Sequence, residues 1–233
     1  MRRILIAIAA LSVLFAVFSP AAGADDVMPP GDSAAAVDQT QGKWNLRNND
    51  GLANTFYFGD PGDFPLFGDW NGNSEDSPGV YRQSDGRVYL RNTNDQGIAD
   101  SWFYFGNPGD IPISGDFNGS GTDSISVFRP ATNQFFIINA LGADGGGLGA
   151  AEFDFTFGDS GDMPLSGDWD GDGVDGIGVY RPSTGEFFLR NDLSSGAADE
   201  SFVFGNPGDK PVIGDWDGDR TDEVGVQRGD TWY

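Results

Sequence analysis

The sequence predicts an all-β protein made of four copies of one unit of about 47 residues. Three observations lead to this prediction. Sequence markers recur in a single register, each unit holds four short strand candidates separated by turns, and no segment beyond the first 24 residues shows helical periodicity. Together they indicate a repeat protein whose regular elements are strands.

The clearest marker is Gly-Asp followed by an aromatic residue. Its copies are Gly68-Asp69-Trp70, Gly115-Asp116-Phe117, Gly167-Asp168-Trp169 and Gly214-Asp215-Trp216. Counting between the aspartates gives steps of 47, 52 and 47 residues. A second marker, Phe-x-Phe-Gly, keeps the same steps at residues 56–59, 103–106, 155–158 and 202–205. The five extra residues of the longer step lie in the glycine-rich segment 142–149, for which we expect a longer surface loop.

A third marker is an arginine that follows an apolar strand candidate once in each unit. These arginines are Arg82, Arg129, Arg181 and Arg228. Aspartates are abundant near each of them, so we expect the arginines to pair with neighbouring carboxylates. Binding of a ligand is the alternative role.

Each unit offers four short strand candidates. In the second unit they are residues 111–114, 124–128, 135–139 and 153–157. Alternation is visible in the last of them, where Phe153, Phe155 and Phe157 point one way and the residues between them the other. Four short strands in 40–50 residues are typical of one blade of a β-propeller. The sequence therefore predicts a β-propeller of about four four-stranded blades.

The ends of the repeat region favour a closed ring. Three complete blades span residues 64–106, 111–158 and 163–205. The N-terminal strand candidates 43–48 and 55–58 and the C-terminal candidates 212–214 and 224–226 would then form a fourth blade together, which removes exposed sheet edges. On this hypothesis residues 43–233 are one domain. The alternative is a piece of a longer array, because Trp232 and Tyr233 resemble the start of another strand.

The first residues have the pattern of a signal peptide. Arg2 and Arg3 precede the apolar run Ile4 to Phe18, and Ala22-Gly23-Ala24 is a small-residue cleavage pattern. We expect residues 1–24 to be removed near Ala24 and the protein to be secreted, either extracellular or periplasmic. Residues 25–42 are polar, alanine-rich and contain proline, and we expect a disordered leader there.

The composition excludes several classes of function. The formal net charge is −23, so nucleic acid and anionic membranes are unsuitable partners. The chain has no histidine and no cysteine, which removes histidine bases, thiolate metal sites and disulfides. Aspartates at fixed spacing point instead to divalent cations.

Calcium is the cation that these aspartates suit best. The third unit reads Asp168-Trp169-Asp170-Gly171-Asp172-Gly173-Val174-Asp175, and oxygens at alternate positions of a tight turn converge on one point. Calcium takes six to eight hard oxygens at about 2.3–2.6 Å. The ligands expected in the third unit are Asp168, Asp170, Asp172, the Val174 carbonyl and Asp175; in the fourth unit they are Asp215, Asp217, Asp219, Thr221 and Asp222.

The first two units carry poorer versions of the same loop. Their expected weaker ligands are Asp69, Asn71, Asn73 and Asp76, and Asp116, Asn118, Ser120 and Asp123. Each set loses two charges relative to the third unit. The simpler interpretation of every loop is an Asp-Gly turn in which the aspartates accept hydrogen bonds from loop amides.

The units resemble FG-GAP and VCBS repeats, the calcium-loop repeats of integrin-α-like β-propellers, and most closely the bacterial secreted variety. The matching motifs stand at residues 167–173, 178–182, 189–191 and 204–209, and the resemblance covers residues 43–233. It implies calcium on the alternating loop aspartates, a propeller architecture and a role in adhesion or ligand binding. Many related loops place the closing acid one residue later, where this sequence has Ser77, Ser124, Gly176 and Glu223.

We therefore expect a secreted, calcium-binding extracellular module that binds or adheres to a glycan or protein and has no catalytic activity. The alternatives are a secreted hydrolase and a structural coat component. A hydrolase would show a polar cluster confined to one unit, whereas a coat component would assemble with itself. The many aromatic residues are expected to pack in the sheets. Exposed ones, such as Trp44 or Trp102, could stack on sugar rings.

Overall fold

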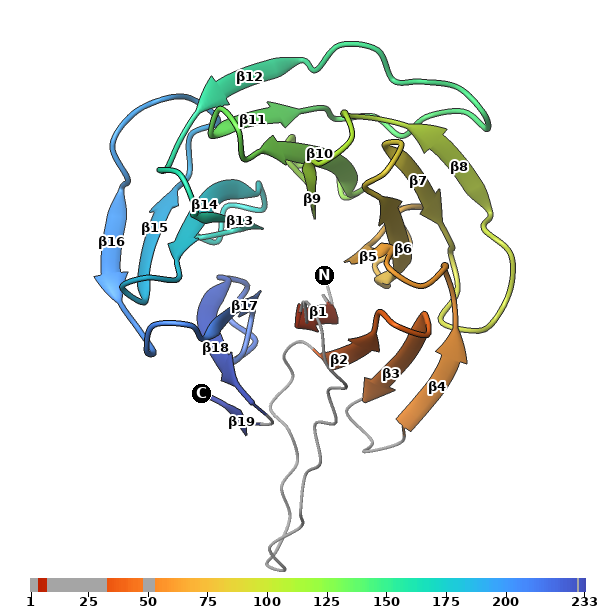
Figure 1. Cartoon of the computed structure of the whole chain (residues 1–233), viewed down its shortest axis with the longest axis horizontal. Coiled ribbons are helices and arrows are strands. Elements are labelled where there is room, and N and C mark those ends of the chain that lie inside the picture. The colour runs from red at the N-terminus through yellow and green to blue at the C-terminus, as the bar shows by residue number, and fades with distance from the viewer. Residues whose placement is uncertain (1–3, 8–32, 48–52, 230) are drawn as a thin grey trace, which may run out of the picture.

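The structure is a computed structural model that describes residues 4–7, 33–47, 53–229 and 231–233. These residues form strands and turns arranged as a ring of sheets around a central axis (Figure 1). Across these ranges, no helix has the length and apolar character needed to cross a membrane. The prediction of an all-β propeller is confirmed.

The ring has five blades. Blade 1 comprises β1 (Ile4–Ala7), β2 (Ser33–Asp38), β3 (Lys43–Arg47) and β4 (Ala53–Tyr57). Blade 2 comprises β5 (Phe64–Gly68), β6 (Ser77–Arg82), β7 (Arg87–Leu90) and β8 (Ser101–Tyr104). Blade 3 comprises β9 (Ile111–Gly115), β10 (Ser124–Arg129), β11 (Gln134–Ile137) and β12 (Phe153–Thr156). Blade 4 comprises β13 (Met163–Gly167), β14 (Gly176–Arg181), β15 (Glu186–Arg190) and β16 (Glu200–Val203). Blade 5 comprises β17 (Lys210–Gly214), β18 (Glu223–Arg228) and β19 (Thr231–Trp232).

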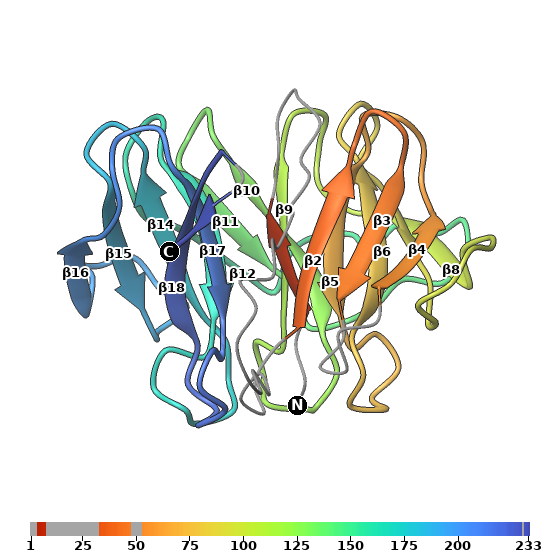
Figure 2. The ribbon, with the colours of Figure 1, turned by 90° about the horizontal axis from the view of Figure 1, so that it is seen from below.

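The innermost strands close the ring. β5, β9, β13 and β17 contact one another in that order, and β1 contacts both β5 and β17. Figure 2 shows the blades side by side, with strands running roughly along the ring axis. Each blade can bury both faces of its sheet against neighbours in this arrangement, so none needs a core of its own.

The expected closure of one blade by both termini is wrong. β3 and β4 belong to a sheet with β2, whereas β17 pairs with β18, which pairs with β19. The reason lies in residues 33–42, which we assigned to a disordered leader but which form β2 and a turn. In β2, Ala35 and Val37 are buried against Trp44 and the rest of the blade 1 core. Residues 25–32 lie outside the described residues.

β1 falls within the expected signal peptide. It pairs in parallel with β2, whereas every other strand pair in the described residues is antiparallel. Cleavage near Ala24 would therefore remove β1 from the mature chain. The remainder of the expected signal peptide lies outside the described residues.

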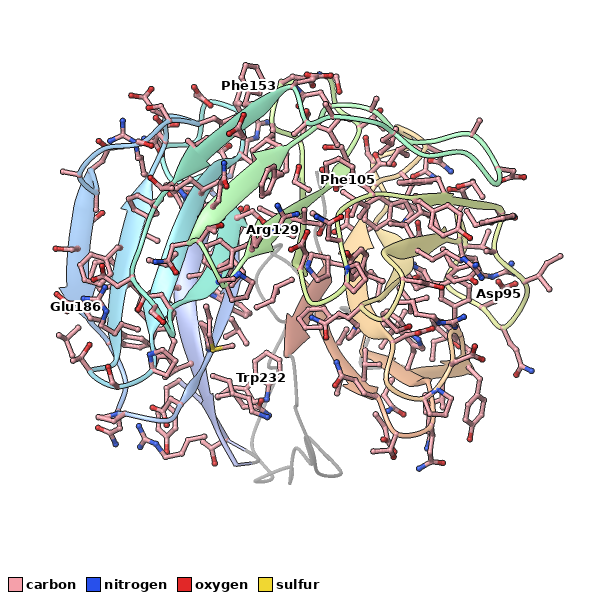
Figure 3. The ribbon with its side chains drawn as sticks, turned by 45° about the horizontal axis from the view of Figure 1, so that its top comes forward. Asp95, Phe105, Arg129, Phe153, Glu186 and Trp232 are labelled. Atoms are coloured by element: carbon pink, nitrogen blue, oxygen red, sulfur yellow. The ribbon has the colours of Figure 1, made fainter. Side chains whose placement is uncertain are left out.

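The core fills the spaces between blades. The second strand of a blade is buried on both faces, as in β6, β10 and β14, whereas the third strand alternates buried and half-buried residues. Phe105 from the Phe-x-Phe-Gly marker packs inside, while Phe153 and Asp95 lie at the rim (Figure 3). The alternating pattern of the sequence therefore corresponds to the packed and outer faces of each blade.

The inner strands border a central cavity of about 160 Å³. Four of them carry proline at the second position, Pro65, Pro112, Pro164 and Pro211. Proline has no N–H to donate, so it suits an edge strand and blocks further strand pairing. Lys210 lies beside this cavity, and loss of hydration lowers its pKa.

The four repeated arginines make the expected ion pairs, and this prediction is confirmed. The pairs are Arg82 with Asp63 at 2.8 Å, Arg129 with Asp110 at 2.7 Å, Arg181 with Asp162 at 2.8 Å and Arg228 with Asp209 at 2.5 Å. All four carboxylates are buried, and each arginine also lies over an aromatic ring. The arginines therefore tie the start of the first strand of a blade to the end of its second strand.

Candidate metal centre in the acidic loops

An acidic loop connects the first and second strands of blades 2 to 5. We call these loops 1 to 4; they span residues 69–76, 116–123, 168–175 and 215–222. Each begins at the aspartate of the Gly-Asp-aromatic marker. The ring therefore repeats one candidate site four times.

The first aspartate of each loop holds the turn together. In loop 3, Asp168 Oδ1 accepts hydrogen bonds from the N–H groups of Gly171 (2.8 Å) and Asp172 (3.1 Å), and its Oδ2 accepts one from Gly173 (2.8 Å). Asp69, Asp116 and Asp215 accept the same kind of bonds in the other loops. The loop geometry is therefore formed by hydrogen bonds within the chain.

The sixth residue of each loop has a left-handed backbone. Gly173 has φ of 86° and Gly121 of 81°, a conformation that glycine adopts without strain. Loops 1 and 4 place Ser74 (φ 65°) and Arg220 (φ 81°) there. A side chain in this region costs on the order of 1 kcal/mol, so loop 4 carries backbone strain that loop 3 avoids.

Loop 3 gathers three carboxylates. Oxygens of Asp168, Asp170 and Asp172 lie within 4.8 Å of one another. Two oxygens that each lie about 2.3–2.6 Å from one calcium ion can be at most about 5.2 Å apart, so this spacing fits a shared cation. Asp170 and Asp172 are exposed, which leaves the cluster open to solvent.

Loop 4 gathers four acidic groups, and one of them was not among the expected ligands. Asp215, Asp217 and Asp219 cluster with Glu223 within the same 4.8 Å. Burial raises the pKa of Glu223, and the charges of the three aspartates add to that rise. From the sequence, Glu223 stood out only as the position where related loops carry their closing acid. The geometry makes Glu223, the first residue of β18, the fourth member of this acidic cluster.

Three of the four expected closing aspartates form hydrogen bonds with the neighbouring blade. Asp175 Oδ2 accepts a hydrogen bond from the Asp116 N–H at 2.6 Å, and the Asp175 N–H donates to the Asp116 carbonyl at 2.9 Å. Asp222 bonds Asp168 in the same two ways, at 2.8 and 2.7 Å. Asp123 and Asp69 form the third such pair. We call each reciprocal pair an inter-blade clasp.

The clasps place the Asp175 and Asp222 carboxylates apart from the other expected ligands of loops 3 and 4. Asp175 and Asp222 are 0% and 7% exposed, and their carboxylates lie outside the clusters of their own loops. They directly precede β14 and β18, the second strands of blades 4 and 5. Asp76, the corresponding residue of loop 1, is buried and lines the central cavity, as Asp123 and Asp222 also do.

The remaining expected ligands take part in the hydrogen bonds of the turn, but their side chains carry no charge. Val174 and Thr221 donate their N–H groups to the carboxylates of Asp172 and Asp219. In loop 1, Asn73 stands where loop 3 has Asp172, and in loop 2 Ser120 stands there. Both N–H groups bond the first aspartate just as in loop 3. The turn therefore forms in all four loops, whereas clusters of three or more acidic groups are found in loops 3 and 4 of the described residues.

Fold and site together define a five-bladed β-propeller with an acidic turn between the first two strands of four blades. No family model matches the chain, and no curated protein sequence matches it. Among solved structures it is similar to virginiamycin B lyase from Staphylococcus aureus, with 9% identity and a TM-score of 0.43 over 87% of this chain and 68% of that one. A streptogramin B lyase gives 8% identity and a TM-score of 0.42, over 87% and 67% of the two chains. At these values neither similarity indicates a function.

Proposed function

We propose that this chain is a secreted, calcium-stabilised β-propeller of the FG-GAP/VCBS-like type, which works outside the cell as a non-catalytic binding or adhesion module. The observation that carries the proposal is the clustering of carboxylates in loops 3 and 4 within 4.8 Å. The signal-like N-terminus supports export. Extracellular calcium-binding modules typically have dissociation constants of about 0.1–1 mM, which suits loops that are open to solvent.

Charge repulsion supports a cation in these clusters. Two carboxylate charges at 4.8 Å, the upper limit of the spacing within these clusters, repel by roughly 1 kcal/mol even at the dielectric constant of water. Loop 3 contains three such pairs, and the whole chain carries a formal charge of −23. A bound divalent cation would turn this repulsion into attraction, and calcium tolerates the irregular oxygen shell of a loop better than magnesium does.

The test is thermal unfolding of the mature protein in chelator and in calcium. At ten times Kd, one site adds about 1.4 kcal/mol, so two sites add roughly 3 kcal/mol and raise Tm by about 5–10 °C. The double variant Asp170→Asn/Asp172→Asn should lose about half of this rise, because loop 3 keeps its shape but loses two charges. A matched double variant in loop 1, Asn71→Ala/Asn73→Ala, should keep nearly all of it.

Calorimetric titration of chelator-treated protein measures the same sites directly. We expect about two calcium ions per chain, with Kd on the order of 0.1–1 mM. Absence of binding at about 10 mM calcium, together with an unchanged Tm, would reduce the loops to ordinary Asp-Gly turns.

A further inference from the structure

The face of blade 2 that packs towards blade 1 carries, near the rim, a cluster that blades 3 and 4 lack. We call it the blade 2 aromatic patch; it consists of Arg87, Tyr89, Trp102 and Tyr104, all half-buried. Tyr89 of this patch packs against the core cluster that contains Trp44 and Phe67. The residues pair across β7 and β8, Arg87 with Tyr104 and Tyr89 with Trp102. The same positions hold Gln134, Thr156, Phe136 and Asp154 in blade 3 and Glu186, Val203, Phe188 and Ser201 in blade 4. Repeat symmetry is therefore broken at one face.

Arg87 occupies the middle of the patch. Its guanidinium carbon lies 5.9, 5.4 and 5.0 Å from the ring centroids of Tyr89, Trp102 and Tyr104. Its nitrogens donate to the Tyr89 hydroxyl at 2.9 Å and to the Tyr104 hydroxyl at 3.1 Å. The rings already surround a cation from the chain itself, so the patch is unsuited to a second cation.

The glycine-rich segment 142–149, which connects β11 and β12 of blade 3 and holds the five extra residues, contacts this patch. Asp144 accepts a hydrogen bond from the Trp102 N–H at 2.9 Å, and the Gly145 N–H donates to the Trp102 carbonyl at 3.0 Å. Gly146 and Leu148 bond the Tyr104 backbone at 2.8 and 3.0 Å. The glycine-rich segment, expected as a longer surface loop, therefore pairs with the outer edge of β8. This support holds the rings in place before any ligand arrives.

Gly145 shows how closely the insertion approaches the patch. Its φ is +74°, and a Cβ atom there would lie 3.3 Å from the Trp102 indole. Only glycine combines this backbone with so close an approach to the ring. The edge of Trp102 in blade 2 is therefore held by the glycine-rich segment of blade 3.

We propose that the blade 2 aromatic patch binds a neutral saccharide. This inference rests on the proposed binding function and names the chemical class of its ligand. Arg87 lies over one side of the three rings, and Arg82 also lies over Tyr89. The ring surface that stays accessible, beside two tyrosine hydroxyls and a guanidinium, suits a sugar, whose ring has C–H faces and hydroxyl edges. A net charge of −23 repels acidic glycans, and Arg87 already fills the place of a cationic ligand. A patch of four residues is too small for a stable protein interface, which needs about 800 Å² on each partner.

The test is calorimetric titration of the mature protein in calcium with soluble hexasaccharides. The neutral probes are β-linked oligomers of glucose, N-acetylglucosamine, xylose and mannose, and the acidic probe is oligogalacturonate. We expect at least one neutral probe to bind with Kd of about 1 mM or below. Trp102→Ala should weaken that binding by about tenfold or more, and Trp102→Phe by less, because a ring remains.

The matched control is Val203→Ala, which changes the position of blade 4 that corresponds to Tyr104 and is 65% exposed. It should bind the sugar as the wild type does. Arg87→Gln is a second variant in case Trp102→Ala does not fold. No binding of any neutral probe at about 10 mM would overturn the proposal, as would unchanged binding by folded Trp102→Ala or Arg87→Gln, or equal binding of oligogalacturonate. The calcium-dependent rise in Tm should persist in all these variants, so a failure here is distinguishable from a failure of the calcium proposal.

Discussion

The clasp between loops 2 and 3 gives the sharpest test of how the blades hold together. Asp175 is fully buried, and its carboxylate accepts the Asp116 N–H at 2.6 Å. Asp175→Ala removes this bond and leaves a buried N–H, while the backbone half of the clasp remains. Asp175→Asn keeps an oxygen that can accept the same bond.

The magnitude follows from the loss of a buried, charge-assisted hydrogen bond. Such a bond contributes about 1.5–3 kcal/mol, and an unsatisfied buried N–H costs about 1–3 kcal/mol. The two figures describe the same lost bond from both sides, so we expect Asp175→Ala to cost about 2–3 kcal/mol. For a domain of this size that lowers Tm by roughly 5–10 °C, and Asp175→Asn should cost less.

The assay is thermal unfolding followed by far-ultraviolet circular dichroism, first in chelator and then in calcium. Asp175→Ala should unfold early in chelator and still gain the calcium-dependent rise, because the cluster of Asp168, Asp170 and Asp172 is intact. Asp170→Ala is the control, since its exposed side chain should matter little in chelator and much in calcium.

The opposite pattern would refute the reasoning. If Asp175→Ala unfolds like the wild type in chelator but no longer responds to calcium, Asp175 is a metal ligand of loop 3 and not a clasp. Equal behaviour of Asp175→Ala and Asp170→Ala in both conditions would also show that the two aspartates share one role.

Three further predictions concern blade 1, loop 4 and the dependence of stability on acidic pH. Trp44 is fully buried, and its Nε1 donates a hydrogen bond to the Phe58 carbonyl at 2.8 Å. Trp44→Ala should therefore lower the free energy of unfolding, measured in urea, by about 3–5 kcal/mol. A decrease below about 1 kcal/mol would mean that blade 1 contributes little to the stability of the fold. Arg220→Gly should raise the free energy of unfolding by about 1 kcal/mol by relieving the positive φ, and a decrease would place Arg220 in a stabilising contact. The Arg228 guanidinium lowers the pKa of Asp209 in the folded state. This pair therefore stabilises the fold fully at pH values above the unfolded pKa of about 3.9. The stabilisation is lost as the pH falls through the lower pKa of the folded state. The stability gap between wild type and Asp209→Asn should therefore narrow from about pH 5 towards pH 2, and a constant gap would contradict the pairing.

The turns and strands that could be predicted from the sequence are those formed by interactions between residues close together along the chain. The acidic loops are held by hydrogen bonds between residues two to five positions apart, such as Asp172 N–H to Asp168, so their shape is readable from a short window. The alternation of Phe153, Phe155 and Phe157 is equally local, and so are the arginine pairs, whose partners repeat at a fixed spacing of 19 positions. For these features the sequence was sufficient.

The blade count was also present in the sequence, but its signal was weak. Residues 33–47 follow the spacing of 176–190, with Gly42 in the place of Gly185 and Trp44 in that of Phe187. β2 reads Ser-Ala-Ala-Ala-Val-Asp, and alanine has a low preference for strands. Only packing against Trp44 and Phe56 makes this segment a strand, so the leader interpretation failed where tertiary contacts outweigh propensity.

The contacts of the closing aspartates and of the blade 2 aromatic patch depend on tertiary structure and not on local sequence. Asp175 and Asp116 are 59 positions apart, and Asp144 reaches Trp102 across 42. No local rule tells a buried aspartate whether to face its own loop or the previous blade, because the choice depends on how neighbouring sheets twist past each other. The sequence determined by itself that acidic turns and aromatic strands recur around one repeat. Ring closure determined which of those side chains meet, since it brings together residues that the chain keeps far apart.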